Sequence, residues 1–321
     1  MSTDPEILPS SYVPSGPPPA PPPGPGAEPD PNAAPLRQIP HFGHTLLFFT
    51  VAVIVLLLTS LSTFAIAMAL HVMGRETPEQ LLREPRLLIP SMAAGYLIAG
   101  AILWAIFTLL WKQPFAWALH WNFSVVRRRF YHLLAGGVLL SLVVQFLSNY
   151  LPVPKTLPID DFFRTSADVW MVAIFGTFLA PLFEELAFRG FLLPSLASAW
   201  DWLRGQRYRS SAGSDLSPIT ARSADVPSAT DLYADPRWSV PALIVSCTVT
   251  SIGFSLLHAD QLAHAWAPLA VLFAVSLVLC LVRLWTHSLA ASTLIHATYN
   301  GTIFTLLFFA TDGFRHLDKI K

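Results

Sequence analysis

The sequence predicts an all-α membrane protein, a bundle of seven or eight transmembrane helices. Of its 321 residues, 53% are hydrophobic and only 12% are charged, and that charged fraction is about half of what a soluble domain carries. The apolar residues also gather in long runs, and roughly 20 residues of helix are enough to cross a bilayer. A formal net charge of zero gives no basic footprint for a nucleic-acid partner, so membrane lipid is the expected surrounding.

Seven apolar runs carry this prediction, separated by polar intervals. They are residues 45–72, 87–111, 131–150, 169–200, 240–258, 268–284 and 288–310. The fourth run is too long for one simple crossing and contains Pro181, Gly190 and Pro194. It therefore predicts either one kinked helix, which gives seven crossings, or two shorter helices that meet in the membrane, which gives eight. Segment 112–130 mixes tryptophans with Arg127–Arg129, a pattern typical of the membrane interface.

The segments outside the transmembrane domain, which we place at residues 44–311, are polar or rich in proline. Residues 1–43 form a Pro-rich tail that is expected to be disordered and extended, either as a flexible tail or as a ligand for SH3-like partners. Residues 201–236 are predicted to be a polar loop insert, and residues 312–321 a short polar tail. We expect a multi-pass protein of the bacterial cytoplasmic membrane, with the endoplasmic reticulum as the alternative.

Cysteine and histidine residues outside the motifs described below are assigned structural positions. The two cysteines, Cys247 and Cys280, lie inside apolar runs, which indicates membrane-buried thiols rather than a disulfide or a metal site. His264 and His287 lie near the ends of predicted spans, so we expect them at the interface.

Three charged residues interrupt the fourth apolar run within the stretch Pro181–Gly190. One charged side chain at the centre of a bilayer costs roughly 2.5–3.5 kcal/mol, so three of them require a chemical reason. Glu185 and Arg189 are four residues apart and can pair on one helix face. Glu184 is rotated about 100° away from Glu185 and has no such cation. A carboxylate of this kind can act as a general base.

Two later runs add polar side chains at helical spacing. Phe254 and His258 are four residues apart, and so are His296 and Asn300, so each pair leaves one face of its helix. Together with Glu184, these residues suggest peptide-bond hydrolysis. A water held between Glu184 and His258 would be deprotonated by the carboxylate. His296 and Asn300, as two neutral donors, would meet the developing oxyanion, where one donor is typically worth about 2.7–4 kcal/mol.

The motifs Glu-Glu-x-x-x-Arg, Phe-x-x-x-His and His-x-x-x-Asn occur here in that order. The chain therefore resembles the CAAX protease and bacteriocin-processing family of intramembrane endopeptidases, also called the abortive-infection family, over about residues 169–310. The resemblance implies a helical fold around a catalytic cavity, and a glutamate-based endopeptidase of a type formerly classed with the metalloproteases. Its substrate would be a peptide or protein, possibly lipidated, since eukaryotic members trim prenylated CAAX proteins.

The same resemblance assigns roles to the motif residues. It implies that Glu184 is the catalytic base, that His258 is its partner on the water, and that His296 and Asn300 form the oxyanion site. Glu185 and Arg189, together with Phe254, would have structural roles around these four.

Three other interpretations remain open. Glu184, His258 and His296 could bind zinc in a metal-dependent version of the protease. We expect no metal or other cofactor, because Asn300 is a poor zinc ligand and a good oxyanion donor. Ionisable residues inside a membrane also mark transporters and proton relays, and a helix broken at Pro181 would suit one. The third possibility is a non-catalytic scaffold.

Overall fold

The computed structural model describes residues 40–71, 84–152, 154, 156–204 and 238–320. Within these ranges every regular element is a helix, which confirms the predicted class. Most of the Pro-rich tail and residues 205–236 of the polar insert lie outside the described residues, so the predictions for them stay predictions.

Ten α-helices are described within these ranges: α1 (Phe42–Ala69), α3 (Pro85–Trp111), α4 (Phe115–Ala118), α5 (Phe123–Ser148), α6 (Ser166–Ile174), α7 (Ala180–Glu185), α8 (Leu193–Leu203), α9 (Val240–Leu257), α10 (Trp266–Thr286) and α11 (Leu289–Ala310). Two π-helical segments, η2 (Phe175–Leu179) and η3 (Leu186–Leu192), lie between α6, α7 and α8. Short 3-10 turns add η1 (Pro158–Phe163), η5 (Asp260–Leu262) and η6 (Leu317–Ile320).

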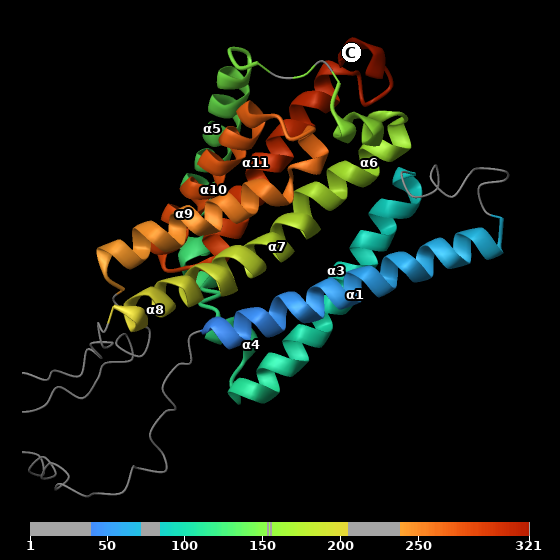
Figure 1. The fold of residues 1–321 in the computed structure, drawn as a ribbon. Coiled ribbons are helices and arrows are strands. Elements are labelled where there is room, and N and C mark those ends of the chain that lie inside the picture. The colour runs from blue at the N-terminus through green and yellow to red at the C-terminus, as the bar shows by residue number, and fades with distance from the viewer. Residues whose placement is uncertain (1–39, 72–83, 153, 155, 205–237, 321) are drawn as a thin grey trace, which may run out of the picture. The chain divides into compact units, whose positions relative to one another are not determined.

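The fourth apolar run forms one continuous helix of 38 residues, Ser166–Leu203 (Figure 1). The run is therefore one continuous helix rather than two short helices. This helix is one of six in the described ranges that are long and apolar enough to cross a membrane; the others are α1, α3, α5, α9 and α10. The predicted seventh span, α11, has 22 residues but carries polar side chains along its length, and it is not among these six. Six such helices support a multi-pass integral membrane protein.

Both π segments end immediately before a proline-containing turn. The Ala180 N–H closes η2 by bonding to the Phe175 carbonyl, five residues earlier. The next residue is Pro181, which has no N–H, so the ladder cannot continue in that register. η3 ends in the same way ahead of Pro194. Since π turns frequently mark functional sites, the two prolines delimit a stretch whose geometry differs from a plain α-helix.

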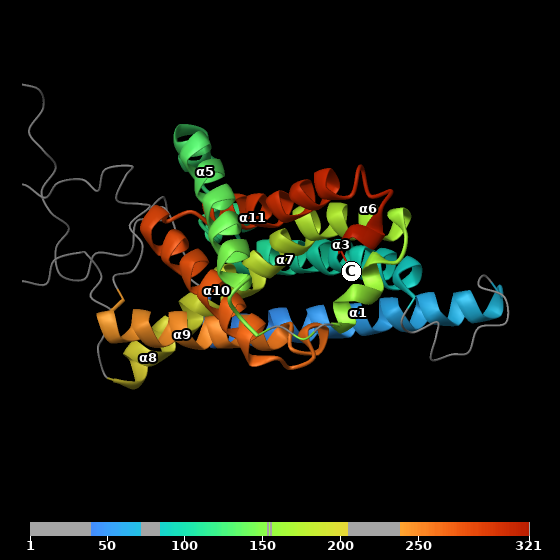
Figure 2. The same ribbon diagram turned by 90° about the horizontal axis from the view of Figure 1, so that it is seen from above.

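Aromatic side chains and close backbone contacts hold the helices together. Phe48 of α1 stacks on Phe191 of η3 with ring centroids 4.5 Å apart, and Phe191 also lies 4.8 Å from Phe107 of α3. On the other side of the continuous helix, α5 packs along α11 (Figures 1 and 2). A Cβ added at Gly137 of α5 would lie 2.6 Å from the Thr298 Cβ, so only glycine permits this approach.

The predicted interfacial segment 112–130 is partly helical in a way the sequence did not indicate. Helix α5 begins at Phe123, so Arg127–Arg129 belong to its first turns rather than to a separate segment. The backbone departs from helical geometry at Arg129 (φ −114°, ψ 17°), which marks a kink at the predicted start of the span. The Arg129 guanidinium lies 4.8 Å over the Trp285 ring, an aromatic contact that suits the membrane interface.

Two segments that were predicted to be polar and irregular are partly ordered in the structure. Helix α8 continues to Leu203, so the start of the predicted insert at residue 201 is helical. Residues 312–321 were predicted to be a polar tail, yet Phe314 is only 1% exposed. Its ring lies 5.1 Å from that of Trp170, and its carbonyl accepts a hydrogen bond from Ser166. The first part of this tail therefore packs back onto α6.

Candidate active site

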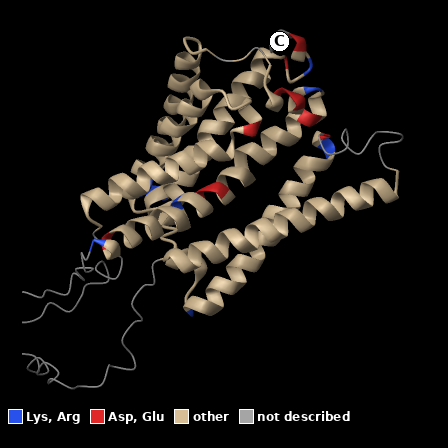
Figure 3. Cartoon of the chain, in the orientation of Figure 1, with Lys and Arg blue, Asp and Glu red and all other residues tan. Residues whose placement is uncertain are grey.

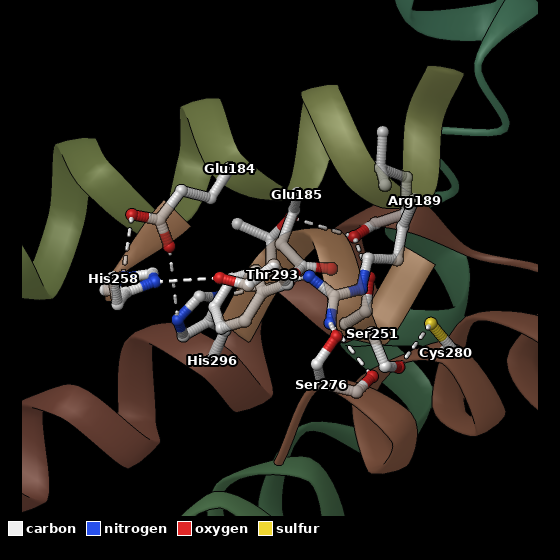
Figure 4. A network of polar contacts seen from close by, with 12 residues as sticks. Glu184, Glu185, Arg189, Ser251, His258, Ser276, Cys280, Thr293 and His296 are labelled. Carbon is white, nitrogen blue, oxygen red and sulfur yellow. Dashed lines mark hydrogen bonds and ion pairs between the residues drawn. The ribbon is translucent and has the colours of Figure 1, made fainter. Parts of the chain in front are cut away.

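The middle of the continuous helix carries two adjacent acidic residues, coloured red in Figure 3. Glu184 and Glu185 are the last two residues of α7. His258 caps the C-terminus of α9, and His296 lies on α11. Figure 4 shows the side chains of these four residues, from three different helices, converging on one network.

Glu184 faces the two motif histidines, as the sequence predicted for its partner His258. Its Oε1 lies 4.0 Å from the His258 Nε2, and its Oε2 lies 3.6 Å from the His296 Nε2 (Figure 4). The Glu184 side chain is 12% exposed, so it is largely but not completely enclosed. Neither distance is a direct hydrogen bond, which leaves room for a bridging group between carboxylate and imidazole.

The backbone of α9 fixes the tautomer of His258. Its Nδ1 lies 2.9 Å from the Phe254 carbonyl oxygen, and a carbonyl can only accept, so Nδ1 carries the proton. In the neutral ring, Nε2 then has a free lone pair and faces Glu184. The Phe254 ring, 5.0 Å from that of His258, packs beside the imidazole. Two hydrogen-bond acceptors therefore face each other across 4.0 Å.

Glu185 and Arg189 form the predicted ion pair, with Oε1 and Nη1 3.0 Å apart and both side chains fully buried. The Arg189 Nη2 also donates to the Ser276 carbonyl at 2.9 Å and to its hydroxyl at 2.7 Å. The guanidinium carbon lies 4.9 Å from the centroid of the Phe254 ring. These contacts tie the continuous helix to α10 and to α9 and supply part of the polar surroundings that a buried charge requires. The Arg189 Nε is buried without a hydrogen-bond partner.

Glu185 also contacts a motif histidine, which was not predicted from the sequence. Its Oε1 also lies 3.0 Å from the His296 Nδ1. Since Glu185 is paired with Arg189, we treat it as an ionised acceptor, so His296 donates through Nδ1. The Nε2 that faces Glu184 can then donate only when the ring carries both protons. The neutral donor expected from the sequence is not compatible with this arrangement. Glu185 consequently orients a predicted catalytic residue as well as pairing with Arg189.

Asn300 connects α11 to the π segment η2. Its Nδ2 donates to the Gly176 carbonyl at 2.7 Å. In the π register set by Ala180 and Phe175, the next N–H would come from Pro181 and would bond to this same carbonyl. Proline cannot provide it, and the Asn300 amide takes its place. The amide has two N–H groups, so one remains for another acceptor.

The bond between Asn300 and Gly176 gives a testable coupling with Pro181. Asn300→Leu leaves the Gly176 carbonyl unpartnered, and we expect it to lower the free energy of unfolding by about 1–3 kcal/mol. Pro181→Ala restores an N–H that can bond to that carbonyl. The cost of Asn300→Leu should therefore be smaller in the Pro181→Ala background, by about 0.5–3 kcal/mol. A double-mutant cycle of thermal unfolding in detergent measures this; strictly additive costs would contradict the coupling.

Two further residues of the network were not singled out from the sequence. Ser276 anchors Arg189, and its signal was a hydroxyl placed within an apolar run. Tyr96 of α3 stacks on Phe183, with ring centroids 4.3 Å apart and an interplanar angle of 14°. It thus packs against the residue that precedes Glu184. No spacing rule could have found it, because α3 is far away in the chain.

Two hollows in the described residues lie away from the predicted catalytic residues. An apolar groove of about 330 Å³ runs between α6, η2 and α11 and includes Thr177 and Gly301, the neighbours of the bonded pair Gly176 and Asn300. The second hollow lies at the corner of α3 and α4.

The other predicted side-chain assignments can be checked in the described residues. Cys247 and Cys280 are buried free thiols, as predicted. His264 and His287 both have positive φ at the ends of helical segments. In the part of the chain that the structure describes, no group of three or more His, Cys, Asp or Glu side chains is arranged to hold a metal ion.

One comparison with known proteins gave a match. The family model described as type II CAAX prenyl endopeptidase Rce1-like matches residues 166–302. The match begins at the first residue of α6 and ends within α11, so it contains every motif residue. Searches among curated proteins and among solved structures gave no match. Residues 166–302 are therefore similar to type II CAAX prenyl endopeptidases, which supports the CAAX protease and bacteriocin-processing family that the motifs predicted.

Proposed function

We propose that this chain hydrolyses a peptide bond within the membrane with a water molecule activated between Glu184 and His258, without a metal ion. The observation that carries the proposal is the 4.0 Å separation between the Glu184 Oε1 and the His258 Nε2. Both atoms are acceptors when Glu184 is ionised and His258 is neutral, because the other nitrogen of His258 donates to the Phe254 carbonyl. A water has two O–H groups and can donate one to each, which directs its lone pairs towards a substrate carbonyl.

Glu184 accepts a proton in the first step of the reaction and donates it in the second. As the water oxygen attacks the carbonyl carbon, its proton passes to Glu184, and a tetrahedral intermediate with an oxyanion forms. Collapse of that intermediate breaks the C–N bond. Glu184 returns the proton to the leaving amine, so the base of the first step is the acid of the second. The products are a new carboxyl terminus and a new amino terminus, and no co-reactant besides water is needed.

His296 and Asn300 are the proposed oxyanion donors. With its Nδ1 donating to Glu185 at 3.0 Å, His296 can donate through Nε2 when the ring carries both protons. Asn300 offers the amide N–H that does not bond to the Gly176 carbonyl. Donors of this kind act where charge develops in the transition state. Glu185 thus contributes indirectly, by holding the imidazole of His296 in place.

The metal-free proposal predicts that chelators have no effect. Purified full-length protein, dialysed against EDTA or 1,10-phenanthroline, should keep its rate of peptide cleavage within about twofold. Added Zn²⁺ should not raise that rate, because the proposed water is activated by Glu184 and His258 alone. Loss of activity on chelation, restored by added Zn²⁺, would instead assign these residues to a metal site.

The family description indicates a peptide or protein substrate, and we propose that it includes proteins lipidated near a C-terminal CAAX sequence. Comparative proteomics of C-termini and membrane peptides, between cells with wild-type protein and cells with Glu184→Gln, would identify it. A substrate should keep its C-terminal segment only in the variant cells. The transporter interpretation would be favoured if wild-type protein cut no peptide but moved protons or solute in liposomes.

A further inference from the structure

The corner between α3 and α4 contains a hollow that the proposed catalytic reaction does not use. Its volume is about 420 Å³, and its lining consists of Trp104, Thr108, Lys112, Gln113, Pro114, Phe115 and Ala116. Helix α3 is one of the candidate membrane spans and ends at Trp111. Lys112 follows at once, so this corner lies where a membrane helix meets the headgroup region.

Two residues that line the hollow each have a buried polar side-chain atom without a hydrogen-bond partner. Gln113 is only 7% exposed, and its Oε1 is buried without a hydrogen bond. The Thr108 hydroxyl, from the last turn of α3, is in the same condition. An unsatisfied buried group costs roughly 1–3 kcal/mol, so such groups require an explanation. Beside them lies the cationic side chain of Lys112, which is exposed. The site therefore offers one cation and an unused acceptor.

We propose that this hollow binds the headgroup of a phospholipid that carries a hydrogen-bond donor beside its phosphate. Lys112 would pair with the phosphate, and the donor would satisfy the Gln113 Oε1. The Thr108 hydroxyl can donate or accept. Trp104 is 58% exposed and would lie along the upper part of an acyl chain. Phe115, which also lines the hollow, stacks on the buried Trp111 with ring centroids 6.0 Å apart.

This chemistry discriminates among common lipids. Phosphatidylethanolamine has an ammonium donor, and phosphatidylglycerol has hydroxyl donors. Phosphatidylcholine has the same phosphate but a quaternary ammonium with no N–H. The phosphate contact with Lys112 is available to all three, whereas the contact with the Gln113 Oε1 is available only to the first two. We therefore expect this hollow to bind phosphatidylcholine more weakly than the other two lipids.

The test uses the full chain, reconstituted in vesicles with equal amounts of the three lipids, extracted in mild detergent and examined by native mass spectrometry. Wild-type protein should retain phosphatidylethanolamine or phosphatidylglycerol over phosphatidylcholine by at least about fivefold. Gln113→Leu, of similar size, should lower this ratio to near one. Lys112→Met should reduce retention of all three lipids. Arg128→Gln changes an exposed cation of α5 and should behave like wild type.

Several results would overturn the proposal. It fails if wild-type protein retains the three lipids equally, or if Gln113→Leu keeps the wild-type ratio. It also fails if an excess of soluble glycerophosphoethanolamine displaces the bound lipid completely, because the hollow would then select a free phosphate ester rather than a membrane lipid. Should Gln113→Leu fold poorly, Thr108→Val provides a second variant of nearly equal volume, for which a reduced ratio is again expected.

Discussion

Glu184→Gln is expected to lower the turnover number by about 10²–10⁴-fold, the contribution of a positioned general base. Glutamine has nearly the same shape but cannot accept the proton of the attacking water. The fold should be retained, because Glu184 makes no contact with Arg189 and its side chain is 12% exposed. The measurement combines the rate of cleavage of a substrate peptide with thermal unfolding of the same purified variant.

His258→Ala tests the same water from its other side. The structure predicts a similar loss of turnover with little change in unfolding temperature, since the ring bonds mainly to the Phe254 carbonyl of its own helix. Cellular function that survived Glu184→Gln unchanged would contradict the account and would favour the non-catalytic scaffold.

Glu185→Gln is expected to destabilise the fold by about 3–5 kcal/mol, because it leaves the charge of Arg189 buried without its partner. Both side chains are fully buried in the wild-type protein, and the ion pair has an N–O distance of 3.0 Å. Activity should also fall, since the bond from the His296 Nδ1 loses its charged acceptor. Denaturant or thermal unfolding in detergent provides the free energy, compared directly with Glu184→Gln.

A double variant separates the two roles of Glu185. Glu185→Leu combined with Arg189→Met removes both charges, and replacing a buried pair by apolar side chains is often neutral for stability. We expect stability to recover relative to Glu185→Gln, while activity stays low because His296 has no acceptor. Equal loss of folded protein in Glu184→Gln and Glu185→Gln would undo this division of roles.

The class of fold and the identity of the ion pair could be predicted from sequence for simple reasons. Long apolar runs report the membrane directly, and a spacing of four residues places Glu185 and Arg189 on one face. The same rule placed His296 with Asn300. It also separated Glu184 from the paired carboxylate, and the structure confirms that Glu184 faces two histidines.

Contacts between helices could not be predicted from the sequence, because the spacing of residues within one helix does not define how that helix is rotated against another. The bond from His296 to Glu185 and that from Asn300 to the Gly176 carbonyl both depend on such rotations. The π segments also shift the register locally, and their only sequence signals were Pro181 and Pro194. The same limit applies at α5, where the start of the span was predicted eight residues after the helix begins at Phe123.

One measurement tests the central claim most directly: cleavage of an identified substrate by purified full-length protein in H₂¹⁸O, followed by mass spectrometry of the products. We predict that wild-type protein places one ¹⁸O atom in the new carboxyl terminus and gives the same yield with EDTA present. Folded Glu184→Gln should give no product above background. Product formation by Glu184→Gln at the wild-type rate would contradict it.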